Sequence, residues 1–263
     1  MPDMKVAAML LAAGRGERMR PLTDAVPKPL LPLRGKPLMQ WLMEALARGG
    51  VTRLVINTAW LGEQIEQAFG GAFAPPLEPF SNHQSLPIRY SREGKDFGGA
   101  LETAGGIVRA LPLLCPAGVG GPGSDVFWVT ACDVFAPDFF FSEAAVQRFA
   151  GSGKLAHLWL VPNPAQKPDG DFGLDPTGLA LSRAEQQYTY STIGLYNKKL
   201  FEPPWCDIAA GNPQGVKAPL APLLRAAMDN ALVSAEIYRG AWTDVGTPER
   251  LQELNQQKEL DPS

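Results

Sequence analysis

Apolar positions along the first half of the chain follow two alternating patterns. The run 5–12 is apolar beyond its first residue and predicts a buried strand, whereas 37–49 carries apolar side chains at helical spacing and ends at a glycine pair. Further segments of both kinds follow, with strands expected at 53–57, 88–91 and 126–130 and helices at 61–69 and 103–111. Strands that alternate with helices predict a parallel sheet covered by helices.

The second half of the chain continues both patterns less regularly. Strands are expected at 156–161, 191–196 and 233–239, a hairpin-like stretch at 171–182, and helices at 221–230 and from 248 onward. Two segments rich in proline and glycine, 70–87 and 115–124, predict surface insertions, and 94–100 predicts a glycine-containing loop. The fold class expected from both halves is α/β.

Composition narrows the classes of protein that the chain could represent. Its 263 residues can bury a full core, and 45% hydrophobic and 19% charged residues are ordinary for a globular protein. The net charge of −3 gives no basic footprint for nucleic acid, and no apolar run approaches the ~20 residues of a membrane span. The apolar run after Lys5 is too short for a secretory signal. Cysteines at 115, 132 and 206 are odd in number and widely spaced, so reduced thiols and a cytoplasmic location are expected.

Candidate chemistry is concentrated directly after the first predicted strand. Gly14 and Gly16 allow backbone N–H groups to approach an anion, and Arg15 and Arg18 can carry the counter-charge. Lys28 follows in a stiff Pro-Lys-Pro frame. The segment contains neither the Gly-x-x-x-x-Gly-Lys-Ser/Thr string of a P-loop nor the third glycine of a dinucleotide fingerprint. A glycine loop bracketed by cations at the end of a strand therefore predicts a triphosphate site of another kind.

The string from Leu11 to Thr23, Leu-Ala-Ala-Gly-Arg-Gly-Glu-Arg-Met-Arg-Pro-Leu-Thr, and the later Pro-Lys-Pro resemble the signature of sugar-1-phosphate nucleotidyltransferases. The resemblance implies a Rossmann-like three-layer α/β/α fold, mainly parallel, with a small antiparallel sugar-binding subdomain. It also implies a single domain over 1–263, with a nucleotide-binding half at about 1–135 and a sugar-binding half at about 136–250. The partners implied are a nucleoside triphosphate and a sugar 1-phosphate, and the question of a homo-oligomer stays open.

The resemblance also assigns roles to individual residues. Arg18 would hold the β- and γ-phosphates, and Lys28 would bridge the α-phosphate and the incoming phosphate. A loop at the start of the helix near 103 would read the base, and the alternative for Thr103 is a plain helix cap. The nucleotide-binding residues expected in this way are Leu11, Ala12, Ala13, Gly14, Arg15, Gly16, Glu102, Thr103 and Ala104.

Two carboxylates are expected to bind Mg²⁺. Asp133 follows the strand at 126–130, and Asp244 stands in a Trp-x-Asp-x-Gly-Thr string, which are the two metal positions of the family. Magnesium commonly takes one or two carboxylates together with phosphate oxygens and water, and either one or two ions would be compatible. The chain has Cys132 where relatives carry glycine, so the packing beside Asp133 departs from the usual pattern.

Three residues are expected at the sugar: Asn163, Asp171 and Gly194. Asn163 and Asp171 belong to Asn-Pro and Gly-Asp-Phe strings that resemble N-acetylmuramate 1-phosphate uridylyltransferases, and so does the Leu-Glu-Thr-Ala-Gly-Gly loop. A simple turn and hairpin would explain Asn163 and Asp171 equally well. Only Arg183 and Glu185 stand near the place of the family's Glu-Lys-Pro motif, which leaves the cation for the sugar phosphate open.

The resulting expectation is transfer of UMP from UTP to N-acetylmuramic acid 1-phosphate in peptidoglycan recycling. One alternative is a mannose- or heptose-1-phosphate guanylyltransferase, which shares the loop and both metal positions. Another is a non-catalytic regulatory subunit that binds a sugar nucleotide. The joint presence of Arg18, Lys28, Asp133 and Asp244 argues against that second alternative.

Overall fold

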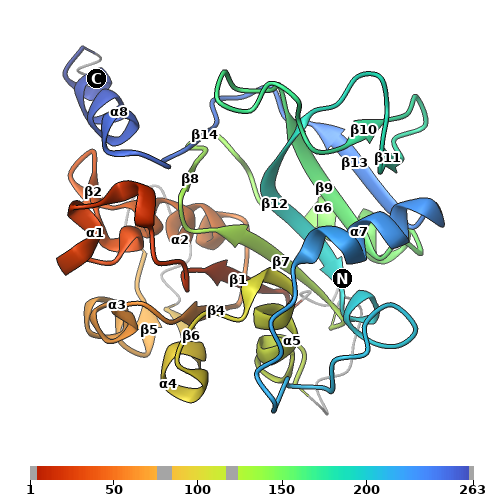
Figure 1. Cartoon of the computed structure of the whole chain (residues 1–263), viewed down its shortest axis with the longest axis horizontal. Coiled ribbons are helices and arrows are strands. Elements are labelled where there is room, and N and C mark those ends of the chain that lie inside the picture. The colour runs from red at the N-terminus through yellow and green to blue at the C-terminus, as the bar shows by residue number, and fades with distance from the viewer. Residues whose placement is uncertain (1–4, 76–84, 117–123, 261–263) are drawn as a thin grey trace.

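The fold is a three-layer α/β/α arrangement around one twisted sheet, as a computed structural model of the chain shows (Figure 1). The structure describes residues 5–75, 85–116 and 124–260, so half of the expected insertion at 70–87 and most of the one at 115–124 lie outside the described residues. The eight strands run in the order β13-β9-β12-β7-β1-β4-β6-β5. Their bounds are β1 (Ala7–Leu11), β4 (Arg53–Thr58), β5 (Ala72–Phe73), β6 (Leu86–Arg92), β7 (Val126–Ala131), β9 (Ala156–Val161), β12 (Thr189–Asn197) and β13 (Val233–Ile237).

The remaining elements surround this sheet. The helices are α1 (Leu22–Ala25), α2 (Leu38–Arg48), α3 (Gly62–Phe69), α4 (Glu93–Phe97), α5 (Glu102–Leu114), α6 (Glu143–Ala150), α7 (Leu220–Asp229) and α8 (Pro248–Leu260). Short 3-10 turns are η1 (Glu17–Met19), η2 (Lys28–Leu30) and η3 (Lys198–Phe201). Three two-stranded pairs join β2 (Pro32–Leu33) to β3 (Lys36–Pro37), β8 (Val134–Phe135) to β14 (Thr243–Asp244), and β10 (Gly173–Leu174) to β11 (Ala180–Leu181).

Parallel pairing dominates the sheet, as the alternation of strands and helices predicted. β1 lies between β4 and β7 and is parallel to both, and β6 is parallel to β4. β12 is the exception in the middle of the sheet, since it runs antiparallel to β7 and β9. The expected hairpin is present as β10 and β11. The sheet therefore continues without a break through strands of both halves of the chain.

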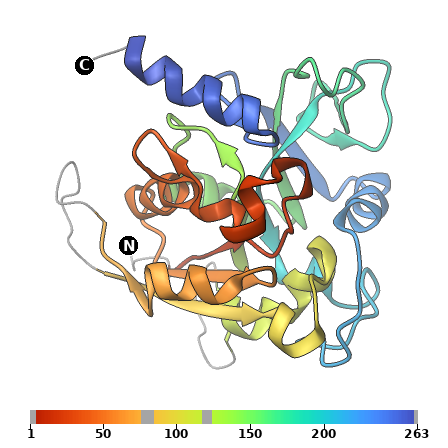
Figure 2. The same ribbon diagram turned by 60° about the vertical axis from the view of Figure 1, so that its left-hand side comes forward.

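The three layers follow from the two-residue period of the strands. Ala8 and Leu10 of β1 join a core that includes side chains of α2 and α6, whereas Ala7 and Met9 join a second core with α5 and α7. A third, smaller cluster includes Met19 and Leu251 and packs α8 over the loops after β1. The rotated view shows α8 lying across this side of the molecule (Figure 2). No helix within the described residues is both long and apolar enough to cross a membrane.

Three helices differ from the sequence expectation, and one of them, α1, is only four residues long. The segment 94–100, expected as a loop, begins with the five-residue helix α4. α6 was not expected at all, although Ser142 caps it by accepting a hydrogen bond from the N–H of Ala145. α4 is too short to display a clear helical period, and the aromatic run at 139–141 obscures the start of α6.

Candidate active site

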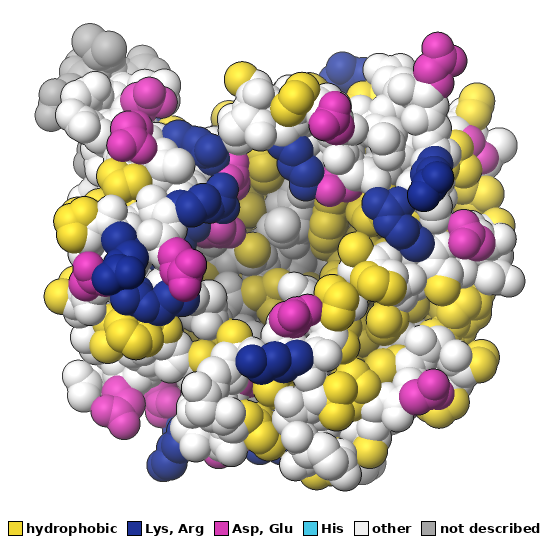
Figure 3. Space-filling view, viewed as in Figure 1, with side chains coloured by type: hydrophobic (Ala, Val, Ile, Leu, Met, Phe, Trp, Pro, Cys, Tyr) yellow, Lys and Arg dark blue, Asp and Glu magenta, His cyan; other side chains and the backbone are white. Residues whose placement is uncertain are grey.

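A cavity of about 490 Å³ opens at the carboxyl ends of β1, β4 and β7. Ligands of open α/β sheets collect at this edge, because the loops that follow the strands can surround a ligand there. The space-filling view shows the molecule hollowed on this face, with Lys and Arg side chains gathered on the rim formed by the α1 region and the base of α8 (Figure 3). The cavity is lined by Leu11, Ala12, Ala13, Gly14, Gly16, Glu17, Arg18, Met19, Lys28, Pro29, Asn57, Glu93, Ala100, Glu102, Thr103, Ala131, Cys132, Asp133 and Gly246.

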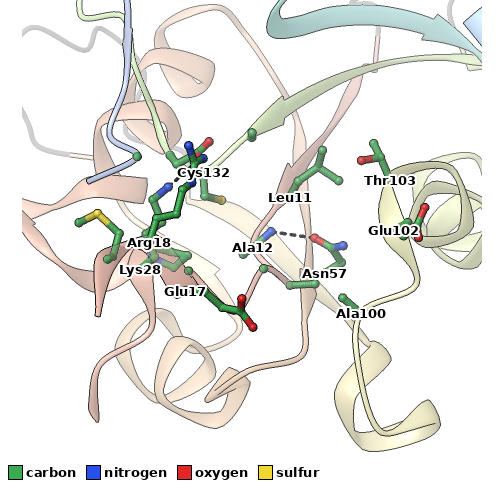
Figure 4. Close-up of a pocket in the computed structure, with 18 of the residues that line it drawn as sticks. Leu11, Ala12, Glu17, Arg18, Lys28, Asn57, Ala100, Glu102, Thr103 and Cys132 are labelled. Atoms are coloured by element: carbon green, nitrogen blue, oxygen red, sulfur yellow. Dashed lines mark hydrogen bonds and ion pairs between the residues drawn. The ribbon is translucent and has the colours of Figure 1, made fainter. Parts of the chain in front are cut away.

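The cavity has a cationic side built by the two short turns after β1. Arg18 on η1 and Lys28 on η2 lie together there, opposite Glu102 and Thr103 across the cavity (Figure 4). The Nζ atom of Lys28 lies 2.7 Å from Oδ2 of Asp133. Arg18 is exposed and has no ion-pair partner within the described part of the chain. The cationic side therefore offers an unneutralised guanidinium to an incoming anion.

Gly16 allows the glycine loop to fold back against this side. Its backbone has φ +67°, in the left-handed region, and a Cβ would lie 3.0 Å from a methyl group of Thr23. Thr23 is fully buried, and its hydroxyl donates to the carbonyl oxygen of Gly16 at 2.8 Å. The buried Thr23 side chain thus holds the loop between β1 and η1 from the protein interior, while Gly14 and Gly16 of this loop line the cavity.

Asp133 and Asp244 are brought together by the pairing of β8 with β14. Asp244 lies opposite Val134 in that pair, and the N–H of Val245 donates to the carbonyl oxygen of Asp133 at 2.7 Å. Asp244 does not itself line the cavity, but Gly246 does. A Cβ on Gly246 would lie 2.8 Å from Oδ2 of Asp244 and 3.5 Å from Nη2 of Arg18. The Asp244 carboxylate therefore lies beside the cationic rim, and only glycine at 246 leaves it room.

The donor set fits one hard divalent cation completed by substrate oxygens. Among the described residues, no group of three or more His, Cys, Asp and Glu side chains could hold a metal ion. Asp133 directly precedes β8 and Asp244 lies on β14, and Mg²⁺ commonly takes one or two carboxylates when phosphates supply further ligands. Asp244 is oriented by Arg250 at 2.6 Å and by an amide N–H of Gln166 at 2.9 Å. Asp133 and Asp244 are thus the residues that would hold such an ion.

The side of the cavity opposite the cations is the start of α5. Glu102, its first residue, has φ +59°, a left-handed backbone that a residue with a side chain rarely adopts. The N–H groups of Ala104 and Gly105 both donate to the carbonyl oxygen of Ala218, so neither is free for a ligand. The helix cap is Leu101, so Thr103 does not act as the cap and lines the cavity instead.

Two buried polar residues of the cavity, Asn57 and Glu93, were absent from the expected site list. Asn57 at the end of β4 accepts a hydrogen bond from the N–H of Ala12. Glu93, the first residue of α4 directly after β6, accepts one from Asn57 and one from the N–H of Leu101. Burial raises the pKa of Glu93, and the two N–H donors oppose that shift. The position of both residues at strand ends is the signal that could have identified them.

Two residues expected at the nucleotide lie outside the cavity lining. Arg15 donates to the carbonyl oxygen of Thr23 and to Asp24, and its guanidinium stacks 3.7 Å from the ring centroid of Trp60. Ala104 is fully buried in α5. Arg15 thus braces the α1 segment, and Ala104 forms part of the core.

The residues expected at the sugar also lie outside this cavity. Asn163 accepts from the hydroxyl of Thr189 and donates to two backbone carbonyl groups, and Asp171 accepts from the N–H of Tyr190 and pairs with Lys167. These contacts match the turn-and-hairpin alternative. A Cβ on Gly194 would lie 2.9 Å from the hydroxyl of Tyr190, so this position in β12 admits only glycine without a shift.

Cys132, which stands where the resemblance implies glycine, packs in the interior beside Asp133. The residue is buried, and its N–H donates to the carbonyl oxygen of Leu11 at 3.1 Å. Burial raises the pKa of its thiol well above the usual range, and the neighbouring Asp133 raises it further. The thiol is therefore neutral and contributes apolar packing beside the cavity.

Comparisons with known proteins agree with this geometry. A model of the nucleotidyl transferase family matches residues 7–114. The N-acetylmuramate alpha-1-phosphate uridylyltransferase of Neisseria meningitidis is 42% identical over 248 residues, which cover 94% of this chain and 95% of the relative. The protein of the same name in Caulobacter vibrioides is 30% identical over 206 residues, or 64% of this chain and 81% of the relative.

A solved structure supports the fold independently of sequence. The crystal structure of a candidate glucose-1-phosphate thymidylyltransferase from Bacillus anthracis, in complex with sucrose, aligns over 97% of this chain and 94% of its own, with a TM-score of 0.70 at 19% identity. The family that the glycine-loop motif had predicted is confirmed by the Neisseria relative. Because the Neisseria relative is similar along nearly its whole length, the chain belongs to the sugar-1-phosphate nucleotidyltransferase family.

Proposed function

We propose that the chain transfers UMP from UTP to N-acetylmuramic acid α-1-phosphate, giving UDP-N-acetylmuramate and pyrophosphate for peptidoglycan recycling. The observation that carries the proposal is the opposition of Arg18 and Lys28 to the Glu102–Thr103 edge across one cavity at the sheet end. A nucleoside triphosphate needs cations around its phosphates and a surface against which its base can lie. The Neisseria relative favours UTP and this sugar over the guanylyltransferase alternative.

The reaction is an in-line displacement at phosphorus. A phosphate oxygen of the sugar 1-phosphate attacks the α-phosphorus of UTP, a new P–O bond forms, and the bond to the β-phosphate oxygen breaks as pyrophosphate leaves. The nucleophile is already an anion, so no general base is needed. The main barrier is the repulsion between two polyanions, so positioning and charge neutralisation carry the catalysis.

Each part of the cationic side has a separate task in this reaction. The N–H groups from Gly14 to Gly16 and the guanidinium of Arg18 bind the β- and γ-phosphates and stabilise the leaving pyrophosphate. Lys28, held at the cavity by Asp133, contacts the α-phosphate and the incoming phosphate. A Mg²⁺ ion held by Asp133 and Asp244 would supply further neutralisation of these phosphates.

The proposal extends to the organisation of the chain. The half at about 1–135 would bind the nucleotide and the half at about 136–250 the sugar, with Asn163, Asp171 and Gly194 shaping the sugar pocket from the second half. We assign the reaction to the cytoplasm, because its nucleoside triphosphate is drawn from the cytoplasmic pool.

A pyrophosphate-release assay tests the proposal directly. UTP, CTP, GTP and ATP are each combined with the 1-phosphates of N-acetylmuramic acid, N-acetylglucosamine, glucose and mannose, with Mg²⁺ present. The expected result is fastest release with UTP and N-acetylmuramic acid 1-phosphate. Preference for GTP with mannose 1-phosphate would identify a guanylyltransferase instead. No release with any pair would support the binding-subunit alternative.

A further inference from the structure

A chain of three buried hydrogen bonds crosses beneath the cavity and joins its two sides. The N–H of Ala12 donates to Oδ1 of Asn57 at 2.8 Å, and Nδ2 of Asn57 donates to Oε1 of Glu93 at 2.7 Å. The other oxygen of Glu93, Oε2, accepts from the N–H of Leu101 at 2.7 Å. We call the Asn57 and Glu93 side chains, with these three bonds, the Asn57–Glu93 relay.

The relay occupies the protein interior at the floor of the cavity. Asn57 is 3% exposed and Glu93 is 0% exposed, yet both line the cavity. Glu93 forms no ion pair within the described residues, so its hydrogen bonds must compensate for the loss of water around the carboxyl group. A buried polar pair that is fully satisfied fixes the segments to which it is bonded.

The sequence of α5 leaves space for the relay. A Cβ on Gly106 would lie 2.6 Å from Oε1 of Glu93 and 3.1 Å from Nδ2 of Asn57. Gly106 is buried inside the helix, where glycine costs stability relative to alanine. Its place in α5 is therefore explained by the contact between the helix and the relay.

The two ends of the relay belong to the two sides of the cavity. Ala12 immediately precedes the glycine loop, and Leu101 immediately precedes the edge formed by Glu102 and Thr103. Glu102 holds a left-handed backbone that a residue with a side chain adopts only at a cost, so the surrounding structure must impose it. On the N-terminal side of Glu102, Leu101 is held at both ends. Its N–H donates to Glu93, and its carbonyl oxygen accepts from the N–H of Ala218 at 3.1 Å.

We propose that Asn57 and Glu93 are positioning residues that hold the Glu102–Thr103 edge at a set distance from the glycine loop, and so determine how tightly the nucleoside triphosphate binds. This inference rests on the proposed function, because it assumes that phosphates and base occupy opposite sides of this cavity. Neither residue is required to touch the reacting phosphorus. Their loss should therefore weaken UTP binding more than it slows turnover at saturation.

The direction of the hydrogen bonds provides a specific test. In Glu93→Gln, one N–H of the new amide must face either Nδ2 of Asn57 or the N–H of Leu101. In Asn57→Asp, a carboxylate oxygen faces Oε1 of Glu93. In the double variant the central bond reverses, with position 93 donating to position 57, while Ala12 and Leu101 keep their acceptors. Each single change breaks the relay, and the two together restore it.

Calorimetric titration with UTP and Mg²⁺ at pH 8 measures the effect without a sugar substrate. Each single variant should bind UTP on the order of tenfold more weakly than the wild type, as expected for one unsatisfied buried group. The double variant should return to within about threefold. In the turnover assay, the single variants should raise the KM for UTP while kcat changes less than about threefold.

Asp96→Asn is the matched control. It makes the same carboxylate-to-amide change on the same helix α4, but Asp96 pairs with Arg109 at 2.7 Å and does not line the cavity. It should bind UTP like the wild type. If a single variant does not fold, recovery of folding in the double variant supports the relay, and failure to recover refutes it.

Different results would refute the relay and the proposed function. Wild-type UTP affinity in both single variants, or a double variant weaker than either single one, refutes the relay while turnover by the wild type stands. Absence of wild-type turnover with every sugar 1-phosphate refutes the proposed function, whatever the binding data show.

Discussion

Removal of the Lys28 ammonium group is the most direct perturbation of the cationic side. Lys28→Met keeps most of the aliphatic stem within η2 and deletes the charge 2.7 Å from Asp133. The Lys28 side chain is 12% exposed and Asp133 is 31% exposed, so the pair lies in a partly desolvated site. Loss of the charge therefore acts on any phosphate that enters the cavity as well as on Asp133.

The size of the effect can be worked from this geometry. Two unit charges about 4 Å apart interact by about 4 kcal/mol at an effective dielectric constant of 20. Loss of one preorganised donor to a developing anion lowers kcat by about 10²–10³, or roughly 3–4 kcal/mol. The effect on folding should be much smaller, because Asp133 is exposed enough to be hydrated, and pairs of this kind contribute at most about 1 kcal/mol.

Steady-state pyrophosphate release and thermal unfolding measure the two effects separately. We expect kcat to fall by about 10²–10³ while the melting temperature shifts by only a few degrees. Lys198→Met is the control, since Lys198 pairs with Asp125 at 2.9 Å beside the start of β7, at the end away from the cavity, and should leave kcat unchanged. A kcat for Lys28→Met within threefold of the wild type would refute the role assigned to this lysine.

Three further predictions concern the metal, a strained backbone and pH. Asp244→Asn should raise the Mg²⁺ concentration for half-maximal activity by on the order of tenfold, and an unchanged titration would argue against metal binding there. Glu102→Gly should relieve the left-handed backbone and stabilise the fold by about 1 kcal/mol in urea unfolding; a lower midpoint would contradict this. Burial lowers the folded-state pKa of His157 below 6.5, so the unfolded chain binds more protons and stability should fall as the pH drops through 6.5. Urea unfolding at pH 5 and 7 should show a smaller loss in His157→Gln, and an equal loss would exclude this histidine as a cause.

Local pattern was sufficient to predict most of the fold. The short apolar run at 5–12 predicted β1, and the helical spacing at 37–49 predicted α2. Both patterns reflect burial against the same core. The helix α4 was missed because periodicity carries little information over its five residues, and α6 was missed because the aromatic run at 139–141 obscures its start. Their positions depend on the strands and loops against which they pack.

On the cationic side of the site, the sequence predicted some of the residues that line the cavity correctly and one of them wrongly. Glycine at 14 and 16 with Arg18 and Lys28 predicted a phosphate loop, and all four residues line one cavity. Arg15 stands in the same motif but pairs with Asp24 on α1 and stacks on Trp60. Whether a cation of this loop lines the cavity depends on the position of segments such as α1 and the residues after β4. The local sequence of the loop does not determine that position.

The sequence by itself determined the family, the order of the elements and the kinds of side chain at the strand ends, because these depend on residues close together in the chain. Only the tertiary structure placed Asp133 beside Asp244, through the pairing of β8 with β14, and joined Asn57 to Glu93 across two strand ends. The residues of each pair are 111 and 36 positions apart. Their contacts follow from the register of strands and loops that meet only after the sheet has formed, so no local pattern encodes them.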